Sequence, residues 1–186
     1  MPKTELTEIT DPKLQERVRA RYQSEVQALQ GIGFVPLTYC HEALGRYSAI
    51  FQFPVVLLMW PKKEIITVTR PFRLGVANVL LVHSRPPSIA ECMGMGVKFY
   101  SAFSDGYILI SPSFQSHAIP RPDSRIIKSP PAQTLERSWY AHVERVKELQ
   151  ALGKTLLNTR SFSDYLEISK LENDESQYLL PVLPGD

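Results

Sequence analysis

The sequence predicts an α+β protein: an N-terminal helix, an antiparallel sheet of about six or seven strands, and two C-terminal helices that pack on the sheet. Residues 11–30 repeat apolar side chains every three or four positions, which is typical of an amphipathic helix. Residues 34–111 contain short apolar or alternating runs bounded by Gly and Pro, which favour strands. Helical spacing returns over residues 132–172, so strands and helices occur in separate runs and a parallel doubly wound fold is not expected.

The chain has 186 residues, of which 44% are hydrophobic and 22% are charged. This composition is typical of a folded globular protein, and the length suits one domain. We therefore expect a single domain over residues 1–186. Its expected parts are a helix over 11–30, a sheet over 34–111, a Pro-rich loop over 112–131, helices over 132–172 and a tail over 173–186.

The first helix has a recognisable start and stop. Asp11 is a suitable N-cap and Pro12 suits the first helical position, where a missing N–H does no harm. Gly31 and Gly33 follow the last apolar residue and favour termination. The predicted buried stripe consists of Leu14, Val18, Tyr22, Val26 and Leu29.

Five segments have the character of strands before residue 85. Pro36 lies in the first and indicates an edge position, because proline cannot donate to a neighbouring strand. Ser88 and Glu91 then form a capping-box pattern, which predicts one short helical turn over 88–93. The strand segments are Phe34–Cys40, Tyr47–Phe53, Val55–Trp60, Ile65–Thr69 and Val76–Val82.

The clearest local signal is a hairpin formed by residues 97–103 and 107–111. Asp105-Gly106 lies between two hydrophobic runs and is typical of a two-residue type I′ turn. This turn places Phe103 opposite Ile108 and Ala102 opposite Leu109. Both faces of the hairpin are then largely apolar, so we expect it near the middle of a sheet that is covered on both sides or lines a cavity.

Two amphipathic helices are expected after the Pro-rich loop, which either covers a site or connects the sheet to the next helix. Ser129 and Pro130 start the first, and Gly153 stops it. Ser161 and Asp164 provide an acidic first turn for the second, over 162–172. The predicted stripe of the first is Leu135, Trp139, His142, Val146 and Leu149, and that of the second is Phe162, Tyr165, Leu166, Ile168 and Leu171.

Charge is unevenly distributed along the chain. The formal net charge is +2, but residues 31–160 sum to +7 and residues 161–186 sum to −5. The favoured interpretation is that the acidic end packs on the basic body, and an anionic partner is the alternative. The basic residues form no dense stripe of the kind that marks a nucleic-acid surface, so no nucleic-acid partner is expected.

Cysteine content and hydropathy predict a cytoplasmic protein. Cys40 and Cys92 are far apart in sequence and too few for a disulfide scaffold, so we expect free, buried thiols. The N-terminus lacks the apolar core of a signal peptide. The longest uncharged runs, 47–61 and 106–120, are shorter than the roughly 18–20 apolar residues that cross a bilayer, and membrane association is not expected.

Motif searches assign no catalytic residue, cofactor or metal. The chain has neither a Gly-x-x-x-x-Gly-Lys loop nor a Gly-x-Gly-x-x-Gly turn between a strand and a helix. Gly-x-Ser-x-Gly is also absent, and Gly45 occupies the position where a zinc-protease motif beginning at His41 requires histidine. Glu91 beside Cys92 disfavours a reactive thiolate at that cysteine.

The leading hypothesis is a non-enzymatic module that binds a small apolar or amphipathic ligand, or a protein partner, through the sheet face and the Pro-rich loop. Apolar pockets use the same side chains as this hairpin, and arginine suits an anionic group on the ligand. Edge strands and the apolar tail also make a homodimer an expectation. The candidate ligand-binding residues are Phe99, Ser101, Phe103, Arg85, Arg121 and Arg125.

Two alternatives belong to other functional classes. One is an enzyme without a recognisable motif that combines His83, Glu91 or His117 with an arginine in a sheet cleft. The other is a peripheral membrane or assembly subunit that uses Val55–Trp60 or the apolar tail, since Trp and the following lysines suit a lipid headgroup region.

Overall fold

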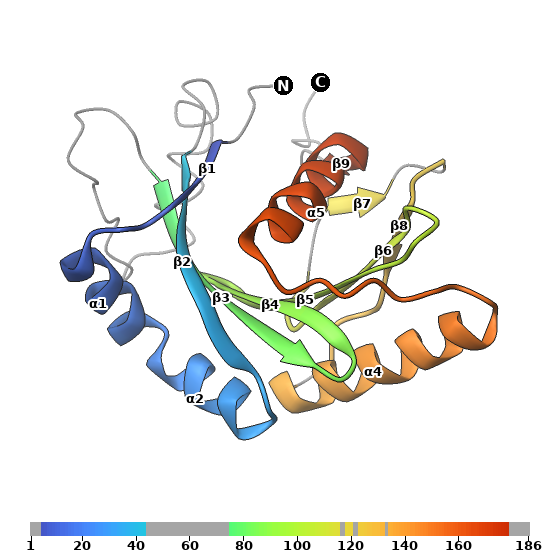
Figure 1. Ribbon diagram of the computed structural model, residues 1–186, viewed down its shortest axis with the longest axis horizontal. Helices are drawn as coiled ribbons and strands as arrows, with labels where there is room; N and C mark the ends of the chain where they lie inside the picture. The colour runs from blue at the N-terminus through green and yellow to red at the C-terminus, as the bar shows by residue number, and fades with distance from the viewer. Residues whose placement is uncertain (1–4, 44–74, 116–117, 121–122, 133, 179–186) are drawn as a thin grey trace, which may run out of the picture.

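A computed structural model describes residues 5–43, 75–115, 118–120, 123–132 and 134–178. Within these residues the protein is α+β, with four helices and a seven-stranded, mostly antiparallel sheet (Figure 1). The expected strands at Tyr47–Phe53, Val55–Trp60 and Ile65–Thr69 lie outside the described residues.

The large sheet has the order β1-β2-β3-β4-β5-β6-β8, and only the β6–β8 pair is parallel. Its strands are β1 Glu5–Glu8, β2 Val35–Ala43, β3 Gly75–Ser84, β4 Pro87–Met93, β5 Gly96–Ala102, β6 Ile108–Pro112 and β8 Ile126–Lys128. A separate ribbon joins β7 Ala118–Pro120 to β9 Ser176–Tyr178. The helices are α1 Pro12–Arg21, α2 Gln23–Gly31, α4 Leu135–Ala151 and α5 Phe162–Glu175.

Helices cover both faces of this sheet (Figure 1). Helices α1, α2 and α4 lie on one face, here called the α4 face, and α5 lies on the other, the α5 face. Side chains alternate between the two faces along each strand. In β5, for example, Phe99 packs on the α4 face and Tyr100 on the α5 face. The two C-terminal helices therefore pack on the sheet, as expected, but from opposite sides.

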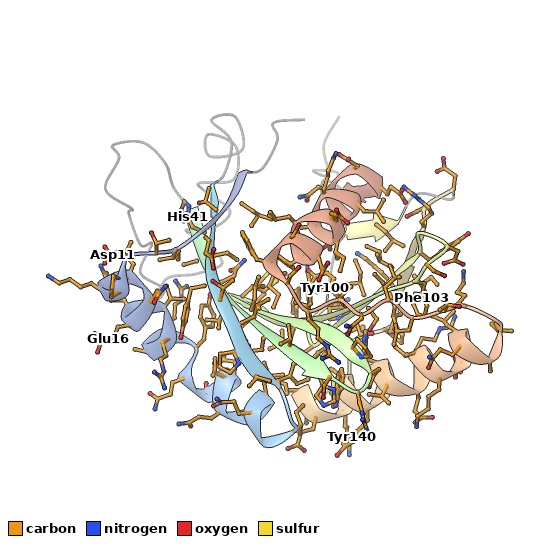
Figure 2. All side chains as sticks on the ribbon, in the orientation of Figure 1. Asp11, Glu16, His41, Tyr100, Phe103 and Tyr140 are labelled. Atoms are coloured by element: carbon orange, nitrogen blue, oxygen red, sulfur yellow. The ribbon has the colours of Figure 1, made fainter. Side chains whose placement is uncertain are left out.

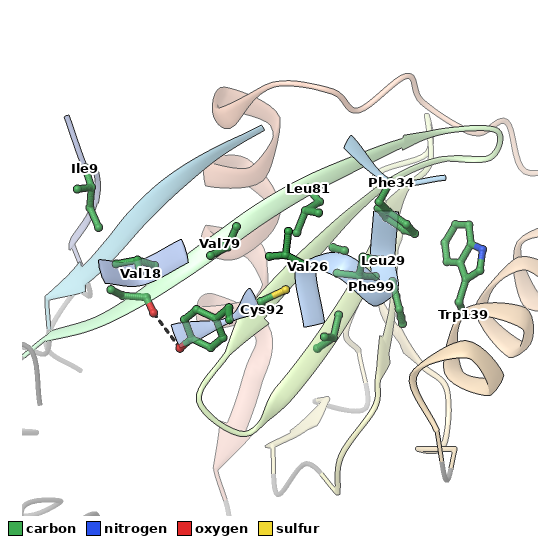
Figure 3. Packing of buried hydrophobic residues seen from close by; sticks show 14 residues of the cluster. Ile9, Val18, Val26, Leu29, Phe34, Val79, Leu81, Cys92, Phe99 and Trp139 are labelled. Carbon is green, nitrogen blue, oxygen red and sulfur yellow. Dashed lines mark hydrogen bonds between the residues drawn. The ribbon is translucent and has the colours of Figure 1, made fainter. Parts of the chain in front are cut away.

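The larger core lies on the α4 face, where α1 and α2 bury the stripe expected from the sequence (Figure 3). Aromatic rings close the end of this core next to α4. The ring centroid of Trp139 lies 4.7 Å from that of Phe34 and 5.3 Å from that of Phe99. Other members of the core are Ile9, Val18, Val26, Leu29, Val79, Leu81 and Cys92.

The helix expected over residues 11–30 is divided into α1 and α2. Asp11 caps α1 by accepting from the backbone N–H of Lys13, as its position suggested. The break occurs at Tyr22, whose φ of −107° and ψ of 21° leave the helical region. Its buried hydroxyl donates to the carbonyl oxygen of Ala77 at 3.0 Å, so a contact with β3 accompanies the break.

The edge position expected from Pro36 is wrong for the strand as a whole. Strand β2 pairs with β3 and also with β1, a strand that the sequence did not reveal. However, β1 pairs only with residues 40–43 of β2. Pro36 lies beyond that contact, at an irregularity in the pairing with β3, so its missing N–H interrupts only the end of the strand.

The helical turn expected over residues 88–93 is wrong, since this segment forms β4. Five consecutive residues of β4 are buried, and the strand pairs with β3 and β5. Ser88 does not cap a turn, because its hydroxyl lies 2.9 Å from that of Ser101 on the adjacent strand. Burial of β4 and its pairing with two strands thus outweigh the capping pattern, because a helix cap contributes only about 1 kcal/mol.

The expected β5–β6 hairpin is present between two other strands of the sheet, but its register differs by one residue. Ala102 lies opposite Ile108, and residues 104–106 form a three-residue loop. Gly106 has a φ of 82°, the left-handed conformation typical of the last residue of such a loop. As a result Ile108 joins the α5 face, whereas Phe103 joins the core beside α4.

The longer loop has a tertiary cause. The backbone N–H of Ser104 donates to the carbonyl oxygen of Thr155 at 2.9 Å, and Phe103 forms a bridge with Leu156. The chain that follows α4 therefore pairs with the end of β5. Sequence next to the turn carries no information about this distant partner, which is why the two-residue turn was the local expectation.

Two boundaries near the Pro-rich segment also differ from expectation. Residues 112–131 are not a continuous loop, because they contain β7 and β8. Helix α4 begins at Leu135 rather than at Ser129 or Pro130, since Thr134 is the residue that caps it, accepting from the backbone N–H of Arg137 at 3.2 Å. The expected buried stripe of α4 is confirmed.

None of the helices in the described residues is long and apolar enough to cross a membrane.

Candidate functional site

The hairpin residues predicted to bind a ligand are buried on the α4 face. Phe99 packs against Phe34 and Trp139, and Phe103 packs in a cluster beside α4. Ser101 is fully buried between Ser88 and α4. Phe99 and Ser101 share one face of β5, and Phe103 follows one residue after its end, but other protein atoms fill the surroundings of all three. Their role in ligand binding stays a prediction.

The structure describes two of the three predicted arginines, and they lie in different parts of the fold. Arg85 is exposed in the turn between β3 and β4. Arg125 precedes β8 and forms an ion pair with Glu175 at 2.7 Å. Arg121 lies outside the described residues.

A chain of hydrogen bonds fixes α4 to the sheet. His142 on α4 places Nε2 2.9 Å from the hydroxyl of Ser101 and Nδ1 2.8 Å from that of Ser111. All three residues are buried, and burial lowers the pKa of His142 to about 3. A serine next to a histidine suits nucleophilic catalysis, but a substrate could reach this serine only if α4 moved. We therefore assign this cluster a structural role.

A second polar cluster lies on the α5 face, around the buried carboxylate of Glu91. Its Oε1 accepts from Asn78 Nδ2 at 2.7 Å and from the Tyr165 hydroxyl at 2.6 Å. Its Oε2 accepts from the Tyr100 hydroxyl at 2.7 Å. Three donors from two strands and α5 thus satisfy a carboxylate that would otherwise be costly to bury.

The Tyr100 hydroxyl also reaches the second carboxylate of the cluster, that of Glu172 on α5. The oxygen–oxygen distance to Glu172 Oε2 is 3.1 Å, and Lys98 Nζ donates to Glu172 Oε1 at 2.9 Å (Figure 2 shows Tyr100 between the sheet and α5). A phenol carries one hydrogen, so Tyr100 donates fully to only one carboxylate at a time. Burial, followed by the charges of Glu172 and Glu91, raises the pKa of Tyr100 well above its usual value.

Lys128 on β8 adds a second cation to this region. Burial lowers the pKa of the Lys128 ammonium, the negative charge of Glu172 opposes this shift, and Lys98 reinforces it. Lys98 and Tyr100 thus contact the carboxylate of Glu172, and Lys128 lies on the same face of the sheet, opposite Ile110 in the β6–β8 pair. We call Lys98, Tyr100 and Lys128 the carboxylate cradle.

Local sequence explains how these side chains meet. Lys98 and Tyr100 are two residues apart in β5 and so share a face. Tyr165, Ile168 and Glu172 follow at spacings of three and four residues in α5 and so share the side that faces the sheet. Tertiary structure alone decides that these two faces pack together.

One buried polar atom in this layer has no partner. The carboxamide oxygen of Asn78 finds no hydrogen-bond donor in the described part of the chain. Buried acceptors in proteins are nearly always satisfied, either by a protein group or by an ordered water.

The end of α5 is held by a second set of contacts. Glu175 Oε2 accepts from the backbone N–H of Arg125 at 2.6 Å and from the Ser124 hydroxyl at 3.2 Å. Together with the Lys98–Glu172 pair, these contacts agree with the expectation that the acidic end packs on the basic body.

Sequence reasoning missed most of this cluster. Glu91 appeared as a capping residue, as the neighbour of Cys92 and as an alternative catalytic group, and Tyr165 appeared only in a buried helical stripe. Lys98, Tyr100 and Glu172 were not singled out. A usable signal was the charged residue within each of two otherwise uncharged strands, Glu91 in β4 and Lys98 in β5. Charges at such positions are rarely buried without a partner.

The described residues contain no candidate metal site, and their two cysteines are buried. No group of three His, Cys, Asp or Glu side chains gathers into a possible metal site within the ranges that the structure describes. Both cysteines are free and buried, and burial raises the pKa of the Cys92 thiol, with Glu25 and Glu91 adding to the effect.

This burial gives a testable expectation for the thiols. In the native protein, we expect Cys40 and Cys92 to react with a disulfide reagent at least about a thousandfold more slowly than in denaturant, because reaction requires unfolding. Counting thiols spectrophotometrically with and without urea checks this. Rapid modification of either thiol in the absence of urea would show that its part of the core opens locally.

Comparison with family models, with curated proteins and with solved structures finds no match to this chain.

Proposed function

We propose that this chain is a non-enzymatic binding module for a small amphipathic ligand, and that the ligand binds on the α5 face of the sheet. The observation that carries this proposal is the attachment of α5 through polar contacts at Glu91, Tyr100 and Glu172. Each such hydrogen bond to a carboxylate is worth about 1.5–3 kcal/mol net, and a ligand that offers equivalent groups can replace it.

Two features support a binding role over the catalytic alternative. His83 contacts Phe34 and Trp139 on the α4 face, whereas Glu91 faces α5, so the sheet separates these two candidate groups. The third candidate, His117, lies outside the described residues. The unsatisfied Asn78 oxygen gives a polar ligand a further point of attachment.

Native mass spectrometry of gently purified protein tests the proposal. We expect an added mass that disappears when the protein is denatured, which would report a retained small molecule. A bare mass, together with no shift after incubation with amphipathic compounds, would contradict the proposal. A bare dimer would instead indicate that apolar surface serves an interface between copies, the homodimer that the sequence left open.

Hydrogen exchange gives an independent expectation for α5. A helix that makes way for a ligand must open at lower free energy than the core. We therefore expect amides of α5 to be at least about tenfold less protected than those in the buried half of α4. Equal protection in both helices would mean that α5 leaves the sheet only on global unfolding, which contradicts ligand exchange at this face.

A further inference from the structure

Glu172 occupies the carboxylate cradle as a bound carboxylate would. It is 6% exposed and contacts Lys98 Nζ at 2.9 Å and the Tyr100 hydroxyl at 3.1 Å, and Lys128 adds a nearby positive charge. All three cradle residues belong to the sheet, whereas the carboxylate belongs to α5. The sheet therefore offers two hydrogen-bond donors, Lys98 and Tyr100, and a neighbouring lysine to a carboxylate that α5 supplies.

The rest of the buried side of α5 is mostly apolar, and its other polar groups are Ser169 and the hydroxyl of Tyr165. Next to Glu172, this helix presents side chains that pack into the core of the α5 face, namely Phe162, Tyr165, Ile168 and Leu171. Beneath them the sheet offers a matching apolar floor composed of Leu80, Ile89, Ile108, Ile110 and Ile126. The buried side of α5 thus combines one carboxylate with an extended hydrocarbon surface.

We propose that the ligand of this module is an amphipathic carboxylate of the fatty-acid type, and that α5 acts as an internal ligand which this molecule displaces. The carboxylate of the ligand takes the place of Glu172 between Lys98 and Tyr100. Its hydrocarbon chain covers the apolar floor that Ile168 and Leu171 now cover. This inference rests on the proposed function and specifies its ligand.

Charge explains why a carboxylate is favoured over other head groups. The positive charges of the two lysines repel a cationic head group. A neutral alcohol cannot form an ion pair with either lysine. Glu91 is also a carboxylate within hydrogen-bonding distance of Tyr100, so a doubly charged phosphate would meet repulsion on that side. A single negative charge on a planar head group fits the arrangement that Glu172 already shows.

Calorimetric titration with four probes tests the head group and the chain separately. The probes are decanoate, 1-decanol, decyltrimethylammonium and acetate. We expect decanoate to bind at least about tenfold more tightly than each of the others, because only decanoate combines a negative charge with a long hydrocarbon chain. Equal affinity for decanoate and 1-decanol would overturn the carboxylate inference but would support an apolar ligand site.

Two double variants test the head-group preference without leaving a buried charge unpaired, which could prevent folding. Lys98→Met/Glu172→Leu removes both partners of a buried pair, a change that is often close to neutral for folding. We expect it to retain the fold and to lose the preference for decanoate over 1-decanol. The matched control, Arg125→Met/Glu175→Leu, releases the end of α5 but leaves the cradle intact, and it should keep that preference.

The single variant Glu172→Gln tests the internal ligand directly. It removes the competing charge and leaves Lys98 and Tyr100 in place, so decanoate should bind about tenfold more tightly than to the unmodified protein. Unchanged or weaker binding would contradict displacement of α5. Failure of all four probes to bind would overturn this inference, while a retained mass in the native spectrum would still support the proposed function.

Discussion

Replacing Glu91 by alanine is expected to lower the free energy of unfolding by about 3–5 kcal/mol. The substitution leaves the Asn78 amide and the Tyr165 hydroxyl buried without the acceptor that they now share. Tyr100 would keep one carboxylate, that of Glu172. Each buried donor without a partner costs about 1–3 kcal/mol, and the missing side-chain atoms leave a cavity in addition.

Urea unfolding at neutral pH measures this effect. Glu167→Ala is the matched control, because it removes an exposed carboxylate from α5 and should change stability by less than about 0.5 kcal/mol. The double variant Glu91→Ala/Tyr165→Phe should lose less stability than the sum of its single variants, since it removes donor and acceptor together. A loss below about 1 kcal/mol for Glu91→Ala would mean that the cluster contributes little to stability.

Lowering the pH from 7 to 5 should destabilise the protein by about 2 kcal/mol through His142 alone. This imidazole is fully buried, and burial lowers its pKa from 6.5 to about 3. Below pH 6.5 the unfolded chain therefore binds a proton that the native protein does not bind. The stabilising effect of the neutral imidazole is complete above pH 6.5 and is lost progressively as the pH falls towards 3.

Urea unfolding at several pH values isolates this contribution when it is compared with His142→Gln, whose side chain does not titrate. The variant will be less stable at pH 7, because its contacts with Ser101 and Ser111 are altered. Between pH 7 and 5, however, its stability should fall by about 2 kcal/mol less than that of the unmodified protein. Parallel pH profiles would show that His142 takes up a proton in the folded state.

Elements with strong local signals could be read from the sequence, and the candidate site could not. The stripes of α1, α2 and α4 were recognised because burial of one helix side imposes a regular spacing. The β5–β6 hairpin was recognised from Asp105-Gly106, although its register was not. The residues around Glu172 escaped notice because Glu172 is more than seventy residues away in sequence from its partners Lys98 and Tyr100.

Amino-acid order by itself determined the α+β class, the stripes of α1, α2 and α4 and the position of the hairpin, because each depends on periodicity or turn chemistry within a few residues. The stripe predicted for α5 was wrong at Leu166, which is exposed. Only the tertiary structure decided that α4 and α5 cover opposite faces, that Ser88 and Glu91 lie in a strand, and that Glu172 meets Lys98. These outcomes depend on contacts between residues that are distant in sequence. Pairing on both sides of β4 outweighs a local capping preference, and packing of α5 brings a carboxylate to the cradle.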